Sequence, residues 1–202
     1  MTDRGQSRPP GIVVLPATSE RWDDVVTLLG GAERGCWCQS WRGSDSPLGR
    51  GQPDRNRLLL RAQVDVGSPA PGVIGYVDGE PVGWCGLGPR ETMPRLMNSR
   101  TIPRVDDEPV WSIGCFVVRP GRRRQGMTRI LLDGAIAYAR SMGATCIEGY
   151  PIDPAGTRVS TAFGFVGFTS TFEAAGFRRV TETDAHSARL PRWLMRLDVA
   201  DR

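Results

Sequence analysis

The stretch that most constrains the fold is residues 110–150, where a strand pattern, an arginine-rich turn, a helical pattern and a second strand pattern follow one another. Residues 110–118 form an almost unbroken apolar run that is rich in β-branched and aromatic side chains. A run of this kind predicts a strand covered on both faces. Pro120 and Gly121 are typical strand-ending residues, so the strand is expected to stop there.

A helix and a second strand are expected to follow the turn. From Gly126 to Tyr138, apolar residues recur every three or four positions, which places them on one helical face. Gly143 occupies the usual glycine position just past a helix end. Residues 144–150 then have the composition of a strand. The whole stretch therefore predicts a strand, a turn, a helix and a strand in sequence.

The turn has the properties of an anion-binding site. Residues 122–126 read Arg-Arg-Arg-Gln-Gly and lie where a strand leads into a helix. The first amides of a helix lack intrahelical partners and lie at the positive end of its dipole, so a diphosphate fits there. The chain contains no lysine, so no Walker loop is present, and the G-x-G-x-x-G pattern is also absent. An ordinary solvated arginine cluster is the alternative interpretation.

The spacing in this region resembles a known family signature. Its positions are filled by small, basic and apolar residues: Val118, Pro120, Arg123, Gly126, Thr128, Leu131 and Leu132. The pattern resembles the acyl-CoA-binding signature Q/R-x-x-G-x-G/A of the GNAT superfamily of N-acetyltransferases. Thr128 stands where glycine or alanine is usual, which predicts a more crowded turn. Residues 170–177, STFEAAGF, are similar to a late motif of the same superfamily.

The resemblance implies acetyl-CoA as co-substrate and direct transfer of its acetyl group to an amine. It implies that the pantetheine arm lies along the first strand and bonds to the backbone of Phe116, Val117 and Val118. It further implies that the pyrophosphate is wrapped by the turn residues Arg123, Arg124, Gln125, Gly126, Met127 and Thr128.

The resemblance also implies an α/β (α+β) fold: a central mixed, mostly antiparallel sheet of about six to seven strands, flanked by helices, with splayed central strands. We expect a flexible tail at residues 1–10 and one domain over residues 11–199. In the first part of the chain we predict a strand at 11–15, a helix from Thr18 or Ser19 to about Leu29, and a helix from Pro53 to Gly67; the buried faces are expected to be Trp22, Val25, Val26 and Leu29 in the first helix and Leu58, Leu59 and Ala62 in the second. In the middle we predict a hairpin at 73–87 that turns at Asp78-Gly79, and a long loop at 91–108 beside the substrate entrance. Near the end we predict a short helix at 172–175 capped by Thr169 or Ser170, and strands at 177–181 and 193–199.

The catalytic residues are harder to assign. The resemblance implies a tyrosine at the position of Phe172 and an asparagine at the position of Phe165, and neither phenylalanine can donate a hydrogen bond. Tyr150 or Ser170 is the candidate donor to the departing thiolate, and Glu108 or Glu148 is the candidate base. We select Tyr150 and Glu108. Glu148 has the alternative of facing a structural arginine.

The cysteines and the histidine give weaker signals. Cys36-Trp37-Cys38 lacks a second ligand pair, so no metal site is expected, and the segment is either a substrate-facing lid or a loop anchored by Trp37 and Trp41. Cys115 has no histidine near it in sequence to activate it, so a buried strand cysteine is expected. His186, the single histidine, is expected in an exposed polar loop.

Composition limits the partners and the location. The formal net charge is only +4, so we expect no nucleic-acid partner. No apolar stretch is long enough to span a membrane, and the first ten residues lack an apolar signal core, so a cytoplasmic location is expected. The sequence leaves the oligomeric state open between a monomer and a homodimer. The resemblance implies a small amine or a peptide amine as acceptor, and Arg90, Arg95 and Arg100 would suit an acidic one. A catalytically silent acyl-CoA sensor is the alternative function.

Overall fold

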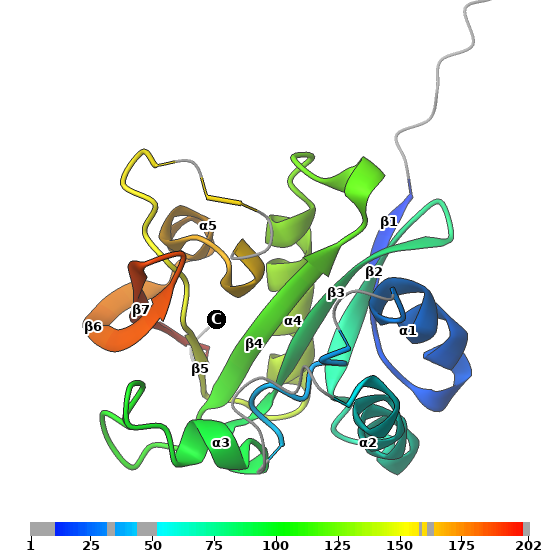
Figure 1. The fold of residues 1–202 in the computed structure, drawn as a ribbon, viewed down its shortest axis with the longest axis horizontal. Helices are drawn as coiled ribbons and strands as arrows, with labels where there is room; N and C mark the ends of the chain where they lie inside the picture. Colours follow the sequence, from blue (N-terminus) through cyan, green and yellow to red (C-terminus); the bar gives the residue numbers. More distant parts are fainter. Residues whose placement is uncertain (1–10, 32–34, 44–51, 158, 161–163, 200–202) are drawn as a thin grey trace, which may run out of the picture.

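The computed structural model describes residues 11–31, 35–43, 52–157, 159–160 and 164–199. These residues form a seven-stranded sheet in the order β1-β2-β3-β4-β5-β7-β6 (Figure 1). The strands are β1 Ile12–Pro16, β2 Gly72–Val77, β3 Glu80–Pro89, β4 Trp111–Val118, β5 Cys146–Gly149, β6 Arg178–Ser187 and β7 Leu190–Asp198. The helices are α1 Trp22–Leu29, α2 Pro53–Val66, α3 Pro94–Met97, α4 Met127–Ser141 and α5 Thr169–Ala174. The expected tail at 1–10 lies outside the described residues.

The sheet is mixed and mostly antiparallel, as predicted. Only β4 and β5 pair in parallel among the described strands. Their ladder has three residue pairs and ends at Ile113↔Gly149, although β4 continues to Val118. Gly114 has no partner in β3, because Gly86 pairs with Cys115 and Leu87 with Ile113. This bulge lies where β4 leaves β5, so the central strands splay apart as predicted.

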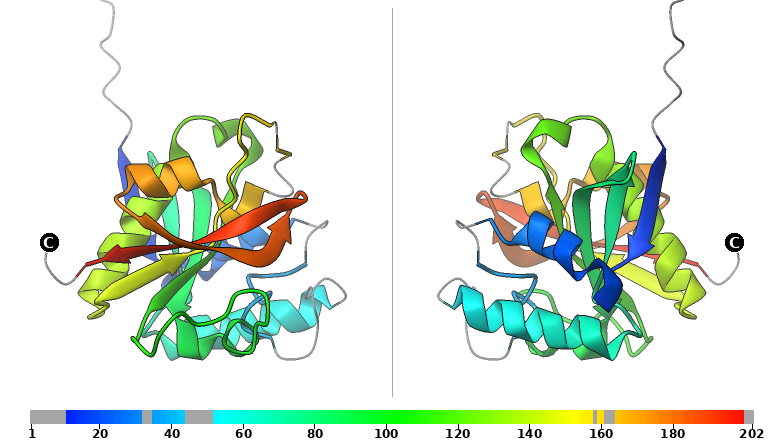
Figure 2. Two further views of the ribbon diagram at one scale, coloured as in Figure 1. Left: turned by 90° about the vertical axis from the view of Figure 1, so that its left-hand side faces the viewer. Right: turned by 90° about the vertical axis from the view of Figure 1, so that its right-hand side faces the viewer.

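The helices cover both faces of the sheet. Helix α4 packs against one face over β1 to β4, and α1 and α2 lie on the other (Figures 1 and 2). The predicted apolar face of α4 is confirmed, because Met127, Leu131 and Ala135 are buried in the largest core cluster. A Cβ at Gly134 would collide with Val14, so glycine allows α4 to approach β1 closely. No helix in the described part of the chain is long and apolar enough to cross a membrane.

The face predicted for α2 is wrong. The buried residues are Asn56, Leu60 and Val64, spaced by four, whereas Leu58 is 70% exposed and Leu59 and Ala62 are also exposed. Three leucines in a row leave the helical phase undetermined by sequence. The phase is set by Asn56, whose amide donates to the carbonyl oxygen of Gly35 at 2.8 Å. A polar residue thus marks the inner face. The predicted end at Gly67 is confirmed, with φ at +83°.

Several boundaries also differ from prediction. A 3₁₀ turn at Ser19–Arg21 precedes α1, and Thr18 makes no capping hydrogen bond. Leu28 joins the buried face of α1, while Val26 is only partly buried. The predicted loop at 91–108 contains α3. Helix α5 begins at Thr169 after an extended Phe168, so neither Thr169 nor Ser170 is its cap.

The C-terminal strands are longer than predicted. His186 lies in β6, where its backbone pairs with Pro191, and not in a loop. Its side chain is exposed, as expected. The alternation of exposed and buried residues in the second half of β6 places every other residue on the core side, with Thr183, Ala185 and Ser187 buried. The polar composition of this segment conceals that alternation in the sequence.

Candidate active site

The turn before α4 exposes a row of backbone amides. Arg124 and Gly126 have left-handed backbone conformations, with φ angles of +62° and +74°, whereas Gln125 between them does not. The amides of Arg129 and Ile130 donate to the carbonyl of Gly126. Within the described part of the chain, the amides of residues 124–128 donate to no carbonyl or side chain. Consecutive unpartnered amides at a helix N-terminus form an anion-binding concavity.

The three arginines of the turn have different surroundings. Arg123 Nε donates to the carbonyl oxygen of Val118 at 3.0 Å, so this side chain braces the turn against the end of β4. Arg122 lies 3.7 Å from the Glu80 carboxylate. Arg124 is exposed and makes no hydrogen bond or ion pair with the described residues. Of the triplet, Arg124 is therefore the side chain left for an incoming anion.

The edge of β4 beyond Ile113 has no strand partner among the described residues, although the 3₁₀ turn Gly164–Val166 packs close to β4. The amide of Arg119 bonds to Val82 of β3, and bonding alternates along an antiparallel ladder, so the main-chain groups of Phe116 and Val118 point to the opposite edge. Beyond Ile113, β5 no longer pairs with that edge. The predicted positions Phe116, Val117 and Val118 thus lie beside the point where β4 and β5 separate. A short turn, Pro120–Arg122, connects the end of β4 with the unpartnered amides of residues 124–128.

A row of polar side chains crosses strands β4, β5 and β7, one residue pair before the β4–β5 ladder ends. Ser112, Glu148 and Arg196 are in register on β4, β5 and β7, and all three are buried. Glu148 Oε2 accepts from Arg90 NH1 at 2.7 Å, and Glu148 Oε1 accepts from Arg196 Nε at 2.8 Å. Asp106 pairs with the outer side of Arg196. Glu148 therefore faces two structural arginines, which is the alternative that the sequence left open.

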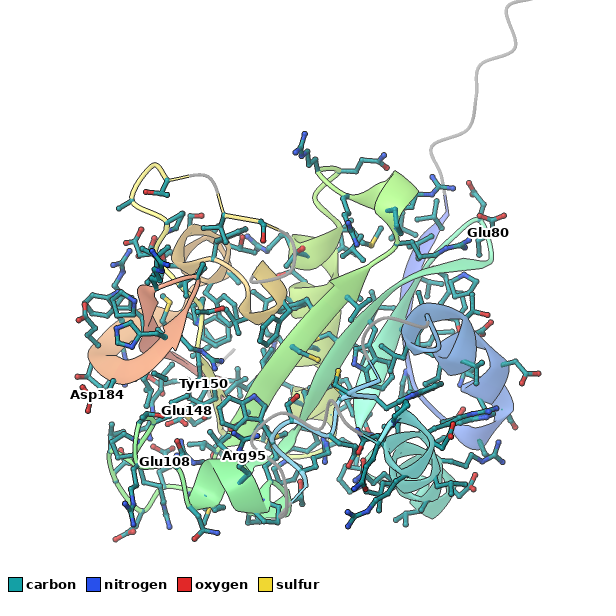
Figure 3. The ribbon with its side chains drawn as sticks, viewed as in Figure 1. Glu80, Arg95, Glu108, Glu148, Tyr150 and Asp184 are labelled. Atoms are coloured by element: carbon teal, nitrogen blue, oxygen red, sulfur yellow. The ribbon has the colours of Figure 1, made fainter. Side chains whose placement is uncertain are left out.

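Tyr150 belongs to the same cluster. Its hydroxyl donates to Glu148 Oε2 at 2.8 Å, accepts from Arg90 NH1 at 3.1 Å and lies 2.9 Å from Ser112 Oγ. Burial, and then the charge of Glu148, raise the pKa of Tyr150 far above its usual value. Its side chain remains protonated at neutral pH. Figure 3 shows Tyr150 and Glu148 together beside β7.

Glu108 lies at the rim of this cluster. Its side chain is 45% exposed, and Oε2 is 3.9 Å from Arg196 NH1. It lines a cavity of about 200 Å³ together with Arg90, Glu91, Met97, Arg104, Asp107, Pro109 and Val110. The two selected residues therefore reach one ion cluster, Glu108 through Arg196 and Tyr150 through Glu148 (Figure 3). The other donor candidate, Ser170, is exposed on α5.

The position of the missing tyrosine is filled by a packed ring. Phe172 is fully buried and contacts Phe116 of β4 and Phe177 edge-on, with centroids 6.1 Å and 4.9 Å away. It thus packs between α5 and the splayed strands and offers no polar group. Phe165, at the asparagine position, is only partly buried.

Residues 35–43, here called the strap, cross the sheet at the bulge. Trp41 packs over Gly114 of β4 and stacks with the buried Arg192 of β7 at 5.2 Å. The carbonyl oxygen of Trp41 accepts from the Arg95 amide of α3. Trp37 is buried and stacks on Trp22. The two tryptophans anchor the loop, as one of the two sequence interpretations predicted.

Sequence reasoning missed most of the ion cluster. The sequence predicts Arg90 only as a contact for an acidic acceptor, but the residue is 3% exposed and paired with Glu148. That expectation is wrong for Arg90. Ser112, Arg196 and Asp106 gave no signal, because each lies in a different segment. Among the described residues, no group of three or more histidine, cysteine, aspartate or glutamate side chains is placed to hold a metal ion.

Comparisons with known proteins agree with this arrangement. The model of the acetyltransferase (GNAT) family matches residues 37–163. A search of curated proteins finds no match.

Solved structures share the fold at low sequence identity. They include yncA from Salmonella typhimurium with its cofactor acetyl-CoA (14% identity, 95% of each chain, TM-score 0.52). They also include an agmatine N-acetyltransferase mutant (10%, 93% and 99%, 0.57) and the ribosomal-protein-S18-alanine N-acetyltransferase of Escherichia coli (12%, 95% and 96%, 0.52). Because the family model covers well over half of the sequence, the chain belongs to the acetyltransferase (GNAT) family.

Proposed function

We propose that this acetyltransferase transfers the acetyl group of acetyl-CoA directly to a primary amine of a small molecule or a peptide. Family membership supports the reaction class. The observation that carries the proposal for this chain is the row of unpartnered amides at residues 124–128, which continues from the open edge of β4. Together they form an extended surface whose two parts suit the two parts of one ligand.

Each part of acetyl-CoA has a matching partner in this surface. The amides of residues 124–128 and the free guanidinium of Arg124 suit the pyrophosphate. The outward main-chain groups of Phe116 and the outward amide of Val118 suit the amide groups of pantetheine, which pair as an added strand does, whereas the Val118 carbonyl oxygen already accepts from Arg123. On this assignment the thioester lies near Gly114, where β4 and β5 separate.

Glu108 is the proposed base. A primary amine is protonated at neutral pH and must lose a proton before its nitrogen attacks the thioester carbon. Glu108 is a partly exposed carboxylate beside the ion cluster that, unlike Asp106, also lines the adjoining cavity, and solvent or that cavity connects it to an acceptor. Its carboxylate takes the ammonium proton, directly or through water.

Tyr150 is the proposed donor to the sulfur when the carbon–sulfur bond breaks. Its raised pKa makes full proton transfer unfavourable, so its role is a hydrogen bond to the departing thiolate. In the resting arrangement its proton points to Glu148. Tyr150 must therefore exchange that bond for one to the sulfur, and solvent completes the protonation of CoA.

The fold does not choose between the two acceptor classes. Structures of similar fold are named for agmatine, a small amine, and for the alanine of a ribosomal protein, a peptide amine. The cavity beside Glu108 contains three carboxylates, of Glu91, Asp107 and Glu108, and two arginines. Arg90 is already paired with Glu148, and Arg104 lies 3.4 Å from Asp107, so Glu91 and Glu108 leave an excess of negative charge on the cavity wall, which favours a cationic acceptor.

Two glycines of one turn provide the test. A Cβ on either Gly126 or Gly121 would meet no atom within 4 Å, but only Gly126 has a positive φ, +74°. Gly126→Val should strain the turn and obstruct the ligand, weakening acetyl-CoA binding by about tenfold or more in calorimetry. Gly121→Val should bind normally. Equal affinity in both variants would contradict the site.

Turnover is measured separately, as free CoA thiol released in the presence of a panel of small amines and peptides. The alternative, an acyl-CoA sensor, is favoured by the absence of a polar group at Phe172 and by the engagement of Glu148 with two arginines. Binding that depends on Gly126, together with no release on any acceptor, would support the sensor. Acceptor-dependent release lost in Gly126→Val would support the transferase.

A further inference from the structure

Two cysteine side chains of the strap and of β4 are in direct contact. Cys38 Sγ lies 2.7 Å from Cys115 Sγ, although 77 residues separate them in sequence. The indole Nε1 of Trp84 donates to Cys38 Sγ at 3.1 Å. A Cβ at Gly86 would collide with the same sulfur, so glycine at this position makes room for Cys38. Three strand residues thus form a socket for one strap thiol.

The strap holds Cys38 in place from both sides. Trp37 and Cys38 have φ angles of +42° and +58°, an uncommon backbone for these residue types. Arg42 donates to the carbonyl oxygen of Leu87 at 2.7 Å, and Trp41 covers Gly114. The sulfur contact is therefore fixed by anchors on both β3 and β4.

The pKa values of the two thiols are shifted in opposite directions. The pKa of Cys38 is lowered, mainly by its hydrogen bond with Cys115. The hydrogen bond from Trp84 and the charge of Arg42 lower it to a smaller extent. The hydrogen bond between the two cysteines and burial raise the pKa of Cys115. Both residues are partly exposed, whereas Cys85 and Cys146 are buried with raised pKa values. Of the two adjacent thiols, Cys38 therefore loses its proton more readily and is the first to meet a small oxidant, with Cys115 beside it.

We propose that Cys38 and Cys115 are a redox pair, which a hydroperoxide converts to a disulfide that locks the strap onto β4. The Cys38 thiolate attacks the peroxide oxygen, the O–O bond breaks, and Cys38 becomes a sulfenic acid. The Cys115 sulfur then attacks the Cys38 sulfur, and hydroxide leaves with the Cys115 proton as water. One hydroperoxide is reduced to water and an alcohol, or to two waters from hydrogen peroxide, and two thiols are oxidised.

Because Cys115 lies at the bulge of β4, a disulfide to Cys38 would restrict the motion of the strap. Cys115 lies between Gly114 and Phe116, at the bulge where β4 leaves β5. A covalent bond there fixes the strap that spans β4, α3 and β7 through Trp41. Oxidation should therefore slow amide hydrogen exchange in residues 36–43, because the strap can no longer lift from the sheet.

The test uses the full chain treated with hydrogen peroxide, alkylated and digested with trypsin. Cleavage after Arg34, Arg42, Arg104 and Arg122 places Cys36 and Cys38 in one peptide and Cys115 in another. We expect a loss of two free thiols and a link between these peptides in the unmodified chain and in Cys36→Ser. The link should be absent from Cys38→Ser and from Cys115→Ser, and exchange in the strap should slow only where the link forms.

Some results would overturn the proposal. These are a link that persists in Cys38→Ser, oxidation of Cys38 to sulfinic acid without any link, or a link only between two chains. Cys36→Ser makes the same atomic change in the same segment but leaves the contacts of Cys38 with Cys115 and Trp84 in place, so it controls for a cysteine-to-serine change in the strap. Thermal melting of all reduced variants separates a folding defect from the loss of the sulfur.

Discussion

Gly149 at the end of β5 lies directly against the ring of Phe172, so that a Cβ on Gly149 would collide with it. Gly149→Ala should lower the free energy of unfolding by about 1–3 kcal/mol, because the buried ring has no space into which to move. Urea denaturation measures the change. Phe172→Leu in the same chain should recover part of the loss, and Gly31→Ala, where a Cβ meets nothing within 4 Å, is the matched control. Strictly additive effects of Gly149→Ala and Phe172→Leu would contradict the contact.

Glu148 should be the residue of the ion cluster that contributes most to stability. Glu148→Gln leaves the guanidinium groups of Arg90 and Arg196 buried without their shared charge, which costs about 3–5 kcal/mol. Glu108→Gln removes a carboxylate 3.9 Å from the same Arg196 but is 45% exposed, so its cost should stay below about 1 kcal/mol. Denaturant midpoints compare the two. A cost below 1 kcal/mol for Glu148→Gln would show that the cluster does not stabilise the fold.

The sequence predicted the central strand, turn and helix because local signals agree there. Residues 110–118 have strand composition, Gly126 permits the positive φ before α4, and Gly143 has the expected φ of +83°. The hairpin through Asp78-Gly79 was predicted for the same reason, with φ angles of +51° and +83° at the two turn residues. These elements are fixed by neighbours in sequence.

The ion cluster and the sulfur contact were not predictable in this way. Ser112, Glu148 and Arg196 become neighbours only when strands β4, β5 and β7 take their order in the sheet. Cys38 and Cys115 meet across two elements. The buried face of α2 was predicted wrongly for a related reason. A hydrogen bond from Asn56 to Gly35, which is distant in sequence, sets the inner face, and the leucine run does not. Local periodicity contains no information on such long-range pairs.

Asp106 gives the cluster a pH dependence. Its hydrogen bond to Arg196 holds the pKa of its carboxyl below the ordinary value of 3.8. A depressed folded-state pKa contributes stability that is fully present above the unfolded pKa and is lost as the pH falls through the folded value. The difference in stability between the native chain and Asp106→Asn should therefore be constant above about pH 5 and shrink below pH 3.8. Thermal melts at pH 3 to 7 measure it, with Asp107→Asn as the neighbouring exposed control. A difference that grows at low pH would contradict the pairing.

Glu108 and Tyr150 should differ in how their loss affects the kinetics. Glu108→Gln removes the base, so kcat should fall by about a hundredfold, with the acidic limb of the pH profile lost and KM for acetyl-CoA unchanged. Glu91→Gln, an exposed residue on the same cavity wall, should retain the profile and is the control.

Tyr150→Phe should lower kcat by roughly tenfold to a hundredfold at every pH, because the raised pKa of Tyr150 keeps it protonated across the working range. Since this change also removes bonds to Ser112 and Glu148, melting curves must show the variant folded. Full activity in both variants would mean that neither residue takes part in the transfer.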